Sequence, residues 1–452
     1  MRSVNPATGE TIRDYPEHGP GEVKAILARA LDAFHAWRGV PFAERRALMR
    51  GAAAELRRHL EDYARLMTAE MGKTFAAAKA EAEKCALCCE FYAGHGEAFL
   101  APEAVATDAS RSLIRYDPLG PVLAVMPWNF PFWQVFRFAA PALMAGNVAL
   151  LKHASNVPGC ALAIETIFKE AGFPPGCFQT LMVGSGAVDA VIGDAAVKAV
   201  TLTGSEPAGM AVAAAAGRAL KKTVLELGGS DPFIILEDAD IQAAARTAAQ
   251  ARCINNGQSC IAAKRFIVVE PAAEAFEQAL LASMGALRVG DPMDPATDVG
   301  PMAREDLRGE LHGQVERSVA AGAVLRLGGR PVEGKGAFYP PTVLTGVAPG
   351  MAAFDEETFG PVAAVIRARD EADAVALANR SPFGLGASLW TKDLRRGEAL
   401  AAQIESGSVF INGMVKSDPR LPFGGIKRSG YGRELSAFGI REFVNIKTVW
   451  IA

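Results

Sequence analysis

Short apolar runs alternate with alanine-rich segments along the middle of this chain, and this alternation constrains the fold more than any other feature. VALLKH (148–153) precedes PGCALAIETIFKEAG, and KAVTLTGS (198–205) precedes PAGMAVAAAAGRALKK. The runs have the length and composition of buried strands, whereas the longer segments are typical of helices. This order predicts βαβ units around a parallel sheet.

The same alternation resumes near residue 229, in segments that include RFIVVE (265–270) and AAVIRARDEADAVALANR (363–380). The first hundred residues instead repeat apolar positions at a spacing of three to four, which indicates helices. The chain has 452 residues, and one domain typically has about 150. We therefore expect two α/β domains with a boundary near Gly228–Gly229.

Two short β-like pieces have no obvious partner nearby in the sequence. They are RSLIRYD (111–117) and the terminal VNIKTVWIA (444–452). We predict that these pieces pair across subunits of an oligomer.

Charge and cysteine usage exclude some classes of protein. The formal net charge is −3 and no basic block occurs, which argues against a nucleic-acid or membrane-surface partner. The most apolar window, 124–151, is interrupted by prolines, Asn129, Gln134 and Arg137, so it does not supply a membrane span. The seven cysteines are an odd number and the first residues contain no apolar signal segment, so we expect a reduced, cytoplasmic protein.

One cysteine lies in an unusual setting. Cys260 follows Asn255, Asn256 and Gly257 in NNGQSCIAAKR, where backbone N–H groups of a turn could face an oxyanion. From these residues alone, a catalytic thiol and a buried structural thiol both stay open. The other cysteines are expected to pack in the core, and no metal site is expected because CALC has no second pair at ligand spacing: Cys85, Cys88, Cys89, Cys160, Cys177 and Cys253.

Three further features have both a functional and a structural interpretation. Glu226 ends the apolar run TVLE, where burial would raise its pKa toward the range of a general base, although a hinge carboxylate is the alternative. Asn129 in PWNFP is either an oxyanion donor or a turn residue. Gly204 and Ser205 lie between a strand and a helix, where phosphate can bind, but the segment is not GxGxxG.

Taken in order, the motifs of this chain resemble those of the aldehyde dehydrogenase superfamily. They are NPATGE, PWNFP, LTGS, LELGG, GQSC, EETFGPV and PFGGIKRSGYGRE, and together they extend over essentially the whole chain. The resemblance implies an α/β fold with a Rossmann-like cofactor domain (1–104 and 118–228) and an α/β catalytic domain (229–422). A small β oligomerisation element (105–117 with 438–452) would join the subunits of a homodimer or homotetramer.

The resemblance also assigns catalytic roles. Cys260 matches the nucleophile, Glu226 the general base, and Asn129 the amide that stabilises the oxyanion together with the Cys260 N–H. An aldehyde would then become a thiohemiacetal, a thioester and finally a carboxylic acid, with NAD or NADP as the cofactor.

Cofactor-binding roles follow from the same motifs. Lys152 matches the lysine at the adenine-side ribose, Gly204 and Ser205 the pyrophosphate turn, and Glu357 the carboxylate at the nicotinamide ribose. Phe359 matches the ring beside the nicotinamide, and Trp128 is a further cofactor-binding position. Many NAD-preferring members have a glutamate where this chain has Ser155, and the loss of that charge makes NADP use plausible.

Within the superfamily, the chain is most similar to the shorter bacterial succinate-semialdehyde dehydrogenases. A semialdehyde acid needs a cation or several donors near the pocket mouth, and Arg137, Lys416, Ser417 and Arg420 are the candidates in the segments that line this pocket in the family. The alternative is that Arg137 packs against a carboxylate and that the loop residues are only solvated.

Other activities also fit the resemblance. The substrate could be another aliphatic or amino aldehyde, or coenzyme A could take the acyl group, although CoA-acylating members commonly lack the glutamate at the Glu226 position. A non-catalytic structural protein of the same fold is the remaining alternative.

Overall fold

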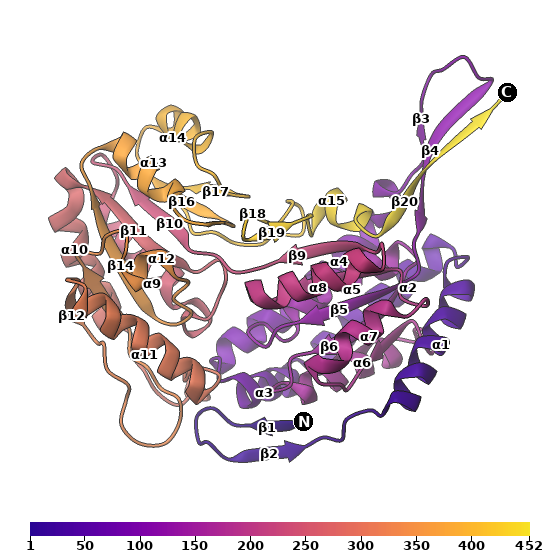
Figure 1. The fold of residues 1–452 in the computed structure, drawn as a ribbon, viewed down its shortest axis with the longest axis horizontal. Helices are drawn as coiled ribbons and strands as arrows, with labels where there is room; N and C mark the ends of the chain where they lie inside the picture. Colours follow the sequence, from indigo (N-terminus) through magenta and orange to yellow (C-terminus); the bar gives the residue numbers. More distant parts are fainter.

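The computed structural model describes residues 1–452, and two large sheets organise it (Figure 1). The first sheet has the order β19-β9-β8-β5-β6-β7, in which only β19 is antiparallel. Its strands are β5 (Pro121–Met126), β6 (Val148–His153), β7 (Phe178–Thr180), β8 (Ala199–Thr203), β9 (Lys222–Glu226) and β19 (Gly430–Tyr431). The helices that connect them are α5 (Trp133–Met144), α6 (Pro158–Glu170), α7 (Val188–Gly193) and α8 (Glu206–Arg218), with the 3₁₀ turn η1 (Ser185–Ala187).

The second sheet has the order β12-β13-β14-β11-β10-β16-β17, in which only the edge strand β12 is antiparallel. Its strands are β10 (Asp231–Ile235), β11 (Ala263–Val269), β12 (Val324–Leu327), β13 (Thr342–Thr345), β14 (Val362–Ala368), β16 (Ala387–Trp390) and β17 (Val409–Ile411). Its helices are α9 (Ile241–Cys253), α10 (Glu270–Gly285), α11 (Glu305–Ala320), α12 (Ala352–Asp355), α13 (Glu371–Asn379) and α14 (Leu394–Ala401).

These parallel sheets confirm the α/β class that the alternation predicts. Central strands such as β5, β8 and β11 are mostly apolar and buried, as strands covered by helices on both faces must be. One cluster of buried apolar side chains surrounds each sheet. The chain crosses from the first sheet to the second at residues 227–230, and it returns to the first sheet at β19.

The first hundred residues form the helices that the periodicity predicts, together with one hairpin that it does not. The helices are α1 (Pro20–Trp37), α2 (Phe42–Arg58), α3 (Leu60–Met71) and α4 (Phe75–Phe99). The hairpin pairs β1 (Arg2–Val4) with β2 (Thr11–Asp14), and its strands are too short to show a clear alternation.

A three-stranded arm projects from the first sheet and carries the C-terminus (Figure 1). In the arm β20 (Val444–Ile451) pairs antiparallel with β4 (Arg111–Pro118), and β4 pairs with β3 (Glu103–Ala104). The two pieces without an obvious partner are therefore partners of each other within one chain. Pairing of the arm with a second chain stays a prediction.

Four short elements complete the fold. The 3₁₀ turn η2 (Ile254–Gly257) follows α9, β15 (Phe383–Gly384) pairs with β18 (Ile426–Lys427), and α15 (Ser436–Arg441) precedes β20. None of the helices combines the length and apolar character that a membrane crossing requires.

Candidate active site

The loop that leads into Cys260 has an unusual backbone. Asn255, Asn256 and Gly257 follow α9 with φ angles of 54°, 58° and 77°, in the left-handed region. Asparagine tolerates this region better than most residues, and glycine occupies it without strain. A side chain at position 257 would also overlap the backbone of Gly360. The sequence Asn-Asn-Gly therefore suits a sharp turn packed against a neighbouring loop.

Polar side chains hold this turn in place. Asn255 Nδ2 donates to the carbonyl oxygens of Asn129 at 2.7 Å and Gln258 at 3.0 Å. Asn256 Nδ2 donates to the carbonyl of Gly72 at 2.9 Å. The turn is thus fastened to the PWNFP segment of the first sheet and to the end of α3.

Lys264 holds the other side of Cys260, and the sequence reasoning missed it. This fully buried ammonium group donates to the carbonyl oxygens of Ser259 at 3.0 Å and Cys260 at 2.8 Å. It also lies 3.5 Å from Glu357 Oε1. The sequence signal for Lys264 is the pair of cations at the start of the otherwise apolar strand AKRFIVV. A charged side chain in a buried strand requires a partner, so these two residues could have been identified as part of a site.

Cys260 lies where two cavities meet. One cavity has a volume of about 560 Å³ and includes Asn129, Gly204, Ser205, Glu357 and Phe359 in its wall. The other has a volume of about 220 Å³ and is lined by α4, α5 and the loop around Ser417. Cys260 and Gln134 belong to both walls. The half-buried thiol is therefore accessible from two directions, whereas the other six cysteines are all buried.

The electrostatic environment of Cys260 favours the thiol over the thiolate. Burial raises the pKa of Cys260 to about 12, and the positive charges of Arg137 and Lys264 offset only part of this effect. The carboxylates of Glu357 and Asp231 act in the same direction as burial. The group is therefore protonated at neutral pH in the chain without cofactor or substrate.

Asn129 is fixed beside Cys260 at the entrance to α5. Its Nδ2 donates to the carbonyl of Gln258 at 3.1 Å, which leaves a second N–H on the same nitrogen. Glu81 of α4 accepts from the backbone N–H groups of Phe132 at 2.8 Å and Trp133 at 2.9 Å, and it forms a buried ion pair with Lys73. We found no sequence signal for this Glu81–Lys73 pair, because the two residues are predicted only as part of a helical region.

Glu226 lies outside both cavities, although Leu227 and Gly228, which follow it, line the larger one. A Cβ built on Gly424 would lie 2.6 Å from Glu226 Oε1, and neither carboxyl oxygen has a hydrogen-bond partner. Burial raises the pKa of Glu226 well above its usual value, and Glu434 adds to this effect. The carboxyl group therefore does not line the cavities that meet at Cys260, and its burial favours the protonated form.

Most of the expected cofactor residues share the larger cavity. Gly204 and Ser205 precede α8, whose first N–H groups have no capping side chain and are free to bind phosphate. Glu357 accepts from the Gly229 N–H at 3.0 Å. The rings of Trp128 and Phe359 meet edge to face at 5.8 Å. This donor set and volume fit a dinucleotide.

Lys152 and Ser155 are not in the wall of the larger cavity, but they lie near it. Lys152 is the penultimate residue of β6, whose end is paired with the end of β5, and Ser155 follows on the loop to α6. The carboxyl ends of parallel strands meet at one edge of the sheet, which is where ligands of such folds bind. Lys152 and Ser155 therefore lie at the same edge of the first sheet as the larger cavity, but outside its wall.

The candidates for substrate binding separate into two groups. Arg137 and Ser417 line the smaller cavity, and so does Lys416. Arg420 does not: its side chain is 76% exposed and is paired with Asp418 two residues away. The structure therefore does not place Arg420 at this cavity, because its side chain is turned to solvent beside Asp418. Lys84, which the sequence reasoning missed, also lines this cavity.

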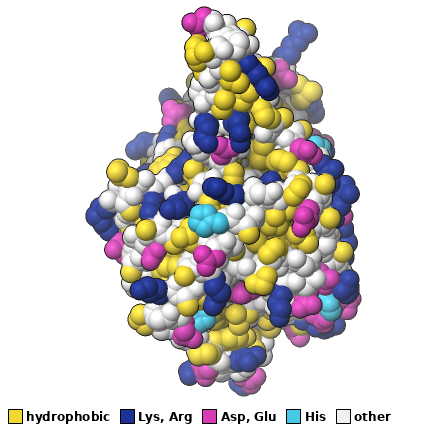
Figure 2. Space-filling model, turned by 90° about the vertical axis from the view of Figure 1, so that its right-hand side faces the viewer, with side chains coloured by type: hydrophobic (Ala, Val, Ile, Leu, Met, Phe, Trp, Pro, Cys, Tyr) yellow, Lys and Arg dark blue, Asp and Glu magenta, His cyan; other side chains and the backbone are white.

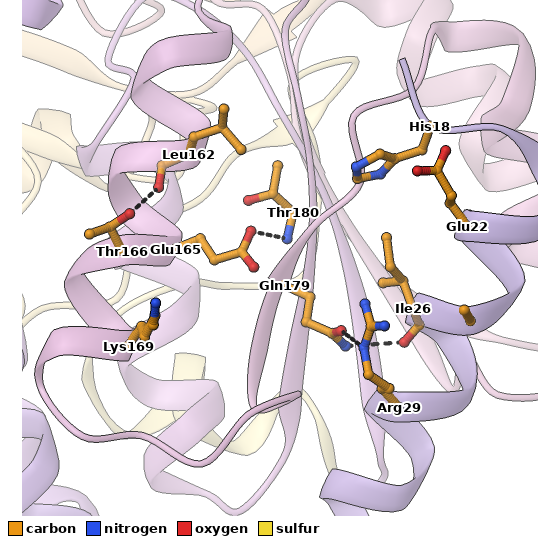
Figure 3. Close-up of a pocket in the computed structure, with 11 residues that line it drawn as sticks. His18, Glu22, Ile26, Arg29, Leu162, Glu165, Thr166, Lys169, Gln179 and Thr180 are labelled. Atoms are coloured by element: carbon orange, nitrogen blue, oxygen red, sulfur yellow. Dashed lines mark hydrogen bonds between the residues drawn. The ribbon is translucent and has the colours of Figure 1, made fainter. Parts of the chain in front are cut away.

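A further cavity of about 520 Å³ lies between α1 and α6 (Figure 3). Several of its polar groups are bonded to one another or to the backbone: Arg29 Nε donates to Gln179 at 3.0 Å, and Glu165 accepts from the Thr180 N–H at 2.9 Å. None of the expected site residues lines it. The meeting point of the other two cavities at Cys260 is therefore the candidate active site.

The chain belongs to the aldehyde dehydrogenase family, whose model matches residues 1–449. It is an NAD(P)-dependent enzyme that oxidises aldehydes. A probable succinate-semialdehyde dehydrogenase [NADP(+)] of Synechocystis is 57% identical over 452 residues, covering all of both chains. Succinate-semialdehyde dehydrogenase [NADP(+)] 1 of Mycobacterium tuberculosis is 56% identical over 455 residues, again covering both chains fully.

A solved structure agrees with these relatives. The succinic semialdehyde dehydrogenase of Streptococcus pyogenes in complex with NADP+ is 37% identical and has a TM-score of 0.98, covering 100% of this chain and 99% of that chain. The resemblance and the fold class inferred from the sequence are thus confirmed.

Proposed function

We propose that this enzyme oxidises succinate semialdehyde to succinate with NADP as its preferred cofactor. One observation carries the proposal: Cys260 lies between a dinucleotide-sized cavity and a smaller cavity lined by cationic and hydroxyl side chains. Such a lining suits an aldehyde that carries a carboxylate. The names of the similar bacterial enzymes support the same substrate.

In the proposed mechanism Cys260 attacks the aldehyde carbon from the junction of the cavities. The free N–H of Asn129 Nδ2 and the backbone N–H of Cys260 stabilise the oxyanion of the thiohemiacetal, a contribution of about 3 kcal/mol for one such donor elsewhere. NADP, when bound, supplies the acceptor for the hydride that leaves this carbon. The product on the protein is a thioester of Cys260.

Hydrolysis of the thioester requires a base, and we assign this role to Glu226. Its side chain must rotate from the position beside Gly424 toward Cys260, and it must also lose the proton that burial favours. Both changes are local, because Leu227 and Gly228 already line the larger cavity. In this assignment water, and not coenzyme A, accepts the acyl group.

The preference for NADP rests on Ser155 and Lys152. Ser155 is exposed and uncharged beside the edge of the sheet where the dinucleotide fits, so no carboxylate repels a 2′-phosphate there. Lys152 provides a positive charge at the end of β6. Trp128, Gly204, Ser205, Glu357 and Phe359 hold the remainder of the dinucleotide in this proposal.

We further propose the following arrangement of the chain. Residues 1–104 and 118–228 form the cofactor domain, 229–422 the catalytic domain, and 105–117 with 438–452 an oligomerisation element of a homodimer or homotetramer. Exposed apolar side chains on the arm, which include Ile446, Trp450 and Ile451, support the last assignment (Figure 2). Sedimentation equilibrium measures the mass of the assembly.

Seven unpaired cysteines support a reducing, cytoplasmic location.

The formation of reduced cofactor with an aldehyde panel tests the proposed function. We expect the highest kcat/KM with succinate semialdehyde and NADP, a lower value with NAD, and no stimulation by coenzyme A. Cys260→Ala should retain less than about 1% of the wild-type rate while it still binds NADP. No turnover of succinate semialdehyde, or a rate that depends on coenzyme A, contradicts the proposal.

A further inference from the structure

Lys84 of α4 lies in the wall of the cavity of about 220 Å³ that Cys260 closes. Its Nζ donates to the hydroxyl of Ser417 at 2.7 Å, across the cavity from α4. The same Nζ lies 4.1 Å from the centre of the Trp133 ring. An ammonium group is thus held by one neutral hydroxyl and one aromatic face in the space where an aldehyde would reach Cys260.

No carboxylate of the chain is bonded to Lys84. Glu81, one turn earlier on α4, is already bonded to Lys73 and to the N–H groups of Phe132 and Trp133. Glu83 is paired with Arg57 on the other side of the helix. Lys84 itself occurs in none of the ion pairs of the structure, so its charge has no counter-ion.

Arg137 also lines this cavity, but it differs from Lys84 because it has a carboxylate partner. It forms a buried ion pair with Glu434, and its guanidinium lies 4.6 Å from the centre of the Phe423 ring. One carboxylate therefore already compensates the charge of Arg137. Of the three cations that line the cavity, only Lys84 is both partly buried and without a carboxylate partner, because Lys416 is exposed.

A partly buried ammonium group without a counter-ion costs free energy, and an anion bound beside it removes that cost. Burial lowers the pKa of Lys84 to about 8, and repulsion from Arg137 adds to this effect, whereas Cys85, Cys88 and Glu81 oppose it. Lys416 also lines the cavity, so the surroundings favour an anionic ligand.

We propose that Lys84, together with the hydroxyl of Ser417, binds the carboxylate of the aldehyde substrate and so determines specificity for short acid semialdehydes. This inference rests on the proposed function, in which the aldehyde carries a carboxylate. Arg137, in contrast, mainly compensates Glu434 and supplies positive potential near Cys260. The substrate class is therefore a straight-chain aldehyde with a carboxylate at its far end.

Lys84→Met tests this inference, because methionine keeps an unbranched side chain of similar size without the charge. The measured quantity is the ratio of kcat/KM for succinate semialdehyde to kcat/KM for butanal, with NADP as cofactor. We expect the ratio to fall at least about 30-fold, mainly through KM for the acid. Lys84→Arg, which keeps the charge, should recover part of the ratio.

Lys79→Met on the same helix is the matched control. Lys79 is partly exposed and paired with Glu61, so its replacement should leave the ratio unchanged.

Two results overturn the role of Lys84. One is an unchanged ratio in Lys84→Met, and the other is an equal loss on both aldehydes, which would indicate a structural role. A wild-type enzyme that prefers butanal contradicts the proposed function instead. In that case calorimetric titration of succinate into the NADP complex tests the role of Lys84. Succinate binding to the wild-type enzyme that is lost in Lys84→Met supports the inference. Equal binding to both enzymes, or no binding to the wild-type enzyme, overturns it.

Discussion

In the proposed mechanism the thiol of Cys260 must become a thiolate before it attacks, and its surroundings in the chain alone oppose this change. Burial raises its pKa to about 12, while Arg137 and Lys264 counteract burial only in part. A protonated thiol protects the enzyme from oxidants and alkylating agents while no substrate is bound. Activation must then come with cofactor or substrate, which change the solvation and the charge next to the sulfur atom.

This environment predicts the pH dependence of alkylation. The pKa lies above the working pH, so the thiolate fraction of Cys260 rises about tenfold for each unit of pH in the range below the pKa. The rate of alkylation by iodoacetamide in the cofactor-free enzyme should therefore increase steadily from pH 7 to pH 10, with mass spectrometry locating the label on Cys260. A rate that levels off below pH 8 would show that the thiol is already activated in the free chain.

Sequence reasoning identified the residues around the reacting atoms better than it identified their orientation. Cys260 and Asn129 share a cavity wall. Glu226 is turned toward Gly424, and Arg420 is turned to solvent by Asp418. Motifs report which residue stands at a position, but rotamers depend on neighbours that are distant in the sequence. Lys84 was missed for the same reason, because it meets Ser417 across more than three hundred residues of chain.

Among the elements, the turn η2 determines where Cys260 lies. The sequence predicts a loop there, because Asn-Asn-Gly is typical of turns. Three successive left-handed residues and the packing of Gly257 against Gly360 are visible only in the structure. The turn is therefore under steric constraint as well as conformational constraint.

Gly257→Ala should lower both stability and activity. Alanine is strained at a φ of +77°, and its Cβ would overlap the backbone of Gly360, so we expect a loss of about 3 kcal/mol or more and a Tm lower by about 5 °C or more. Differential scanning fluorimetry measures this change. Gly94→Ala is the matched control: Gly94 lies on an exposed face of α4 with open space around it, and alanine should preserve or raise Tm there. Equal effects of the two variants would contradict the constraint.

Pairing between remote elements was the least predictable part of the fold. The alternation predicted both parallel sheets, because each strand and the helix after it are local in the sequence. The arm joins β4 to β20, which are far apart in the chain, and no local pattern specifies such a partner. The hairpin of β1 and β2 was missed because its strands have only 3 and 4 residues.

At the scale of the whole molecule, the candidate site depends on both sheets at once. Asn129 and Ser205 follow strands of the first sheet, whereas Cys260 and Lys264 precede or begin a strand of the second. In the proposed mechanism the carboxyl-terminal edge of the first sheet thus binds the cofactor, and the turn before β11 carries the nucleophile. The order of the motifs predicted the family, but the meeting of the two cavities at one sulfur atom required the structure.

In the proposed mechanism Cys260 carries the substrate as a thioester that Glu226 helps to hydrolyse, and Glu226→Gln separates the formation of this thioester from its hydrolysis. After rapid mixing of this variant with NADP and succinate semialdehyde, we predict a burst of about one NADPH per active site, followed by a slow steady state. Mass spectrometry of the quenched sample should find one succinyl group on the peptide that contains Cys260. No burst, or an acyl group on another residue, would contradict the account.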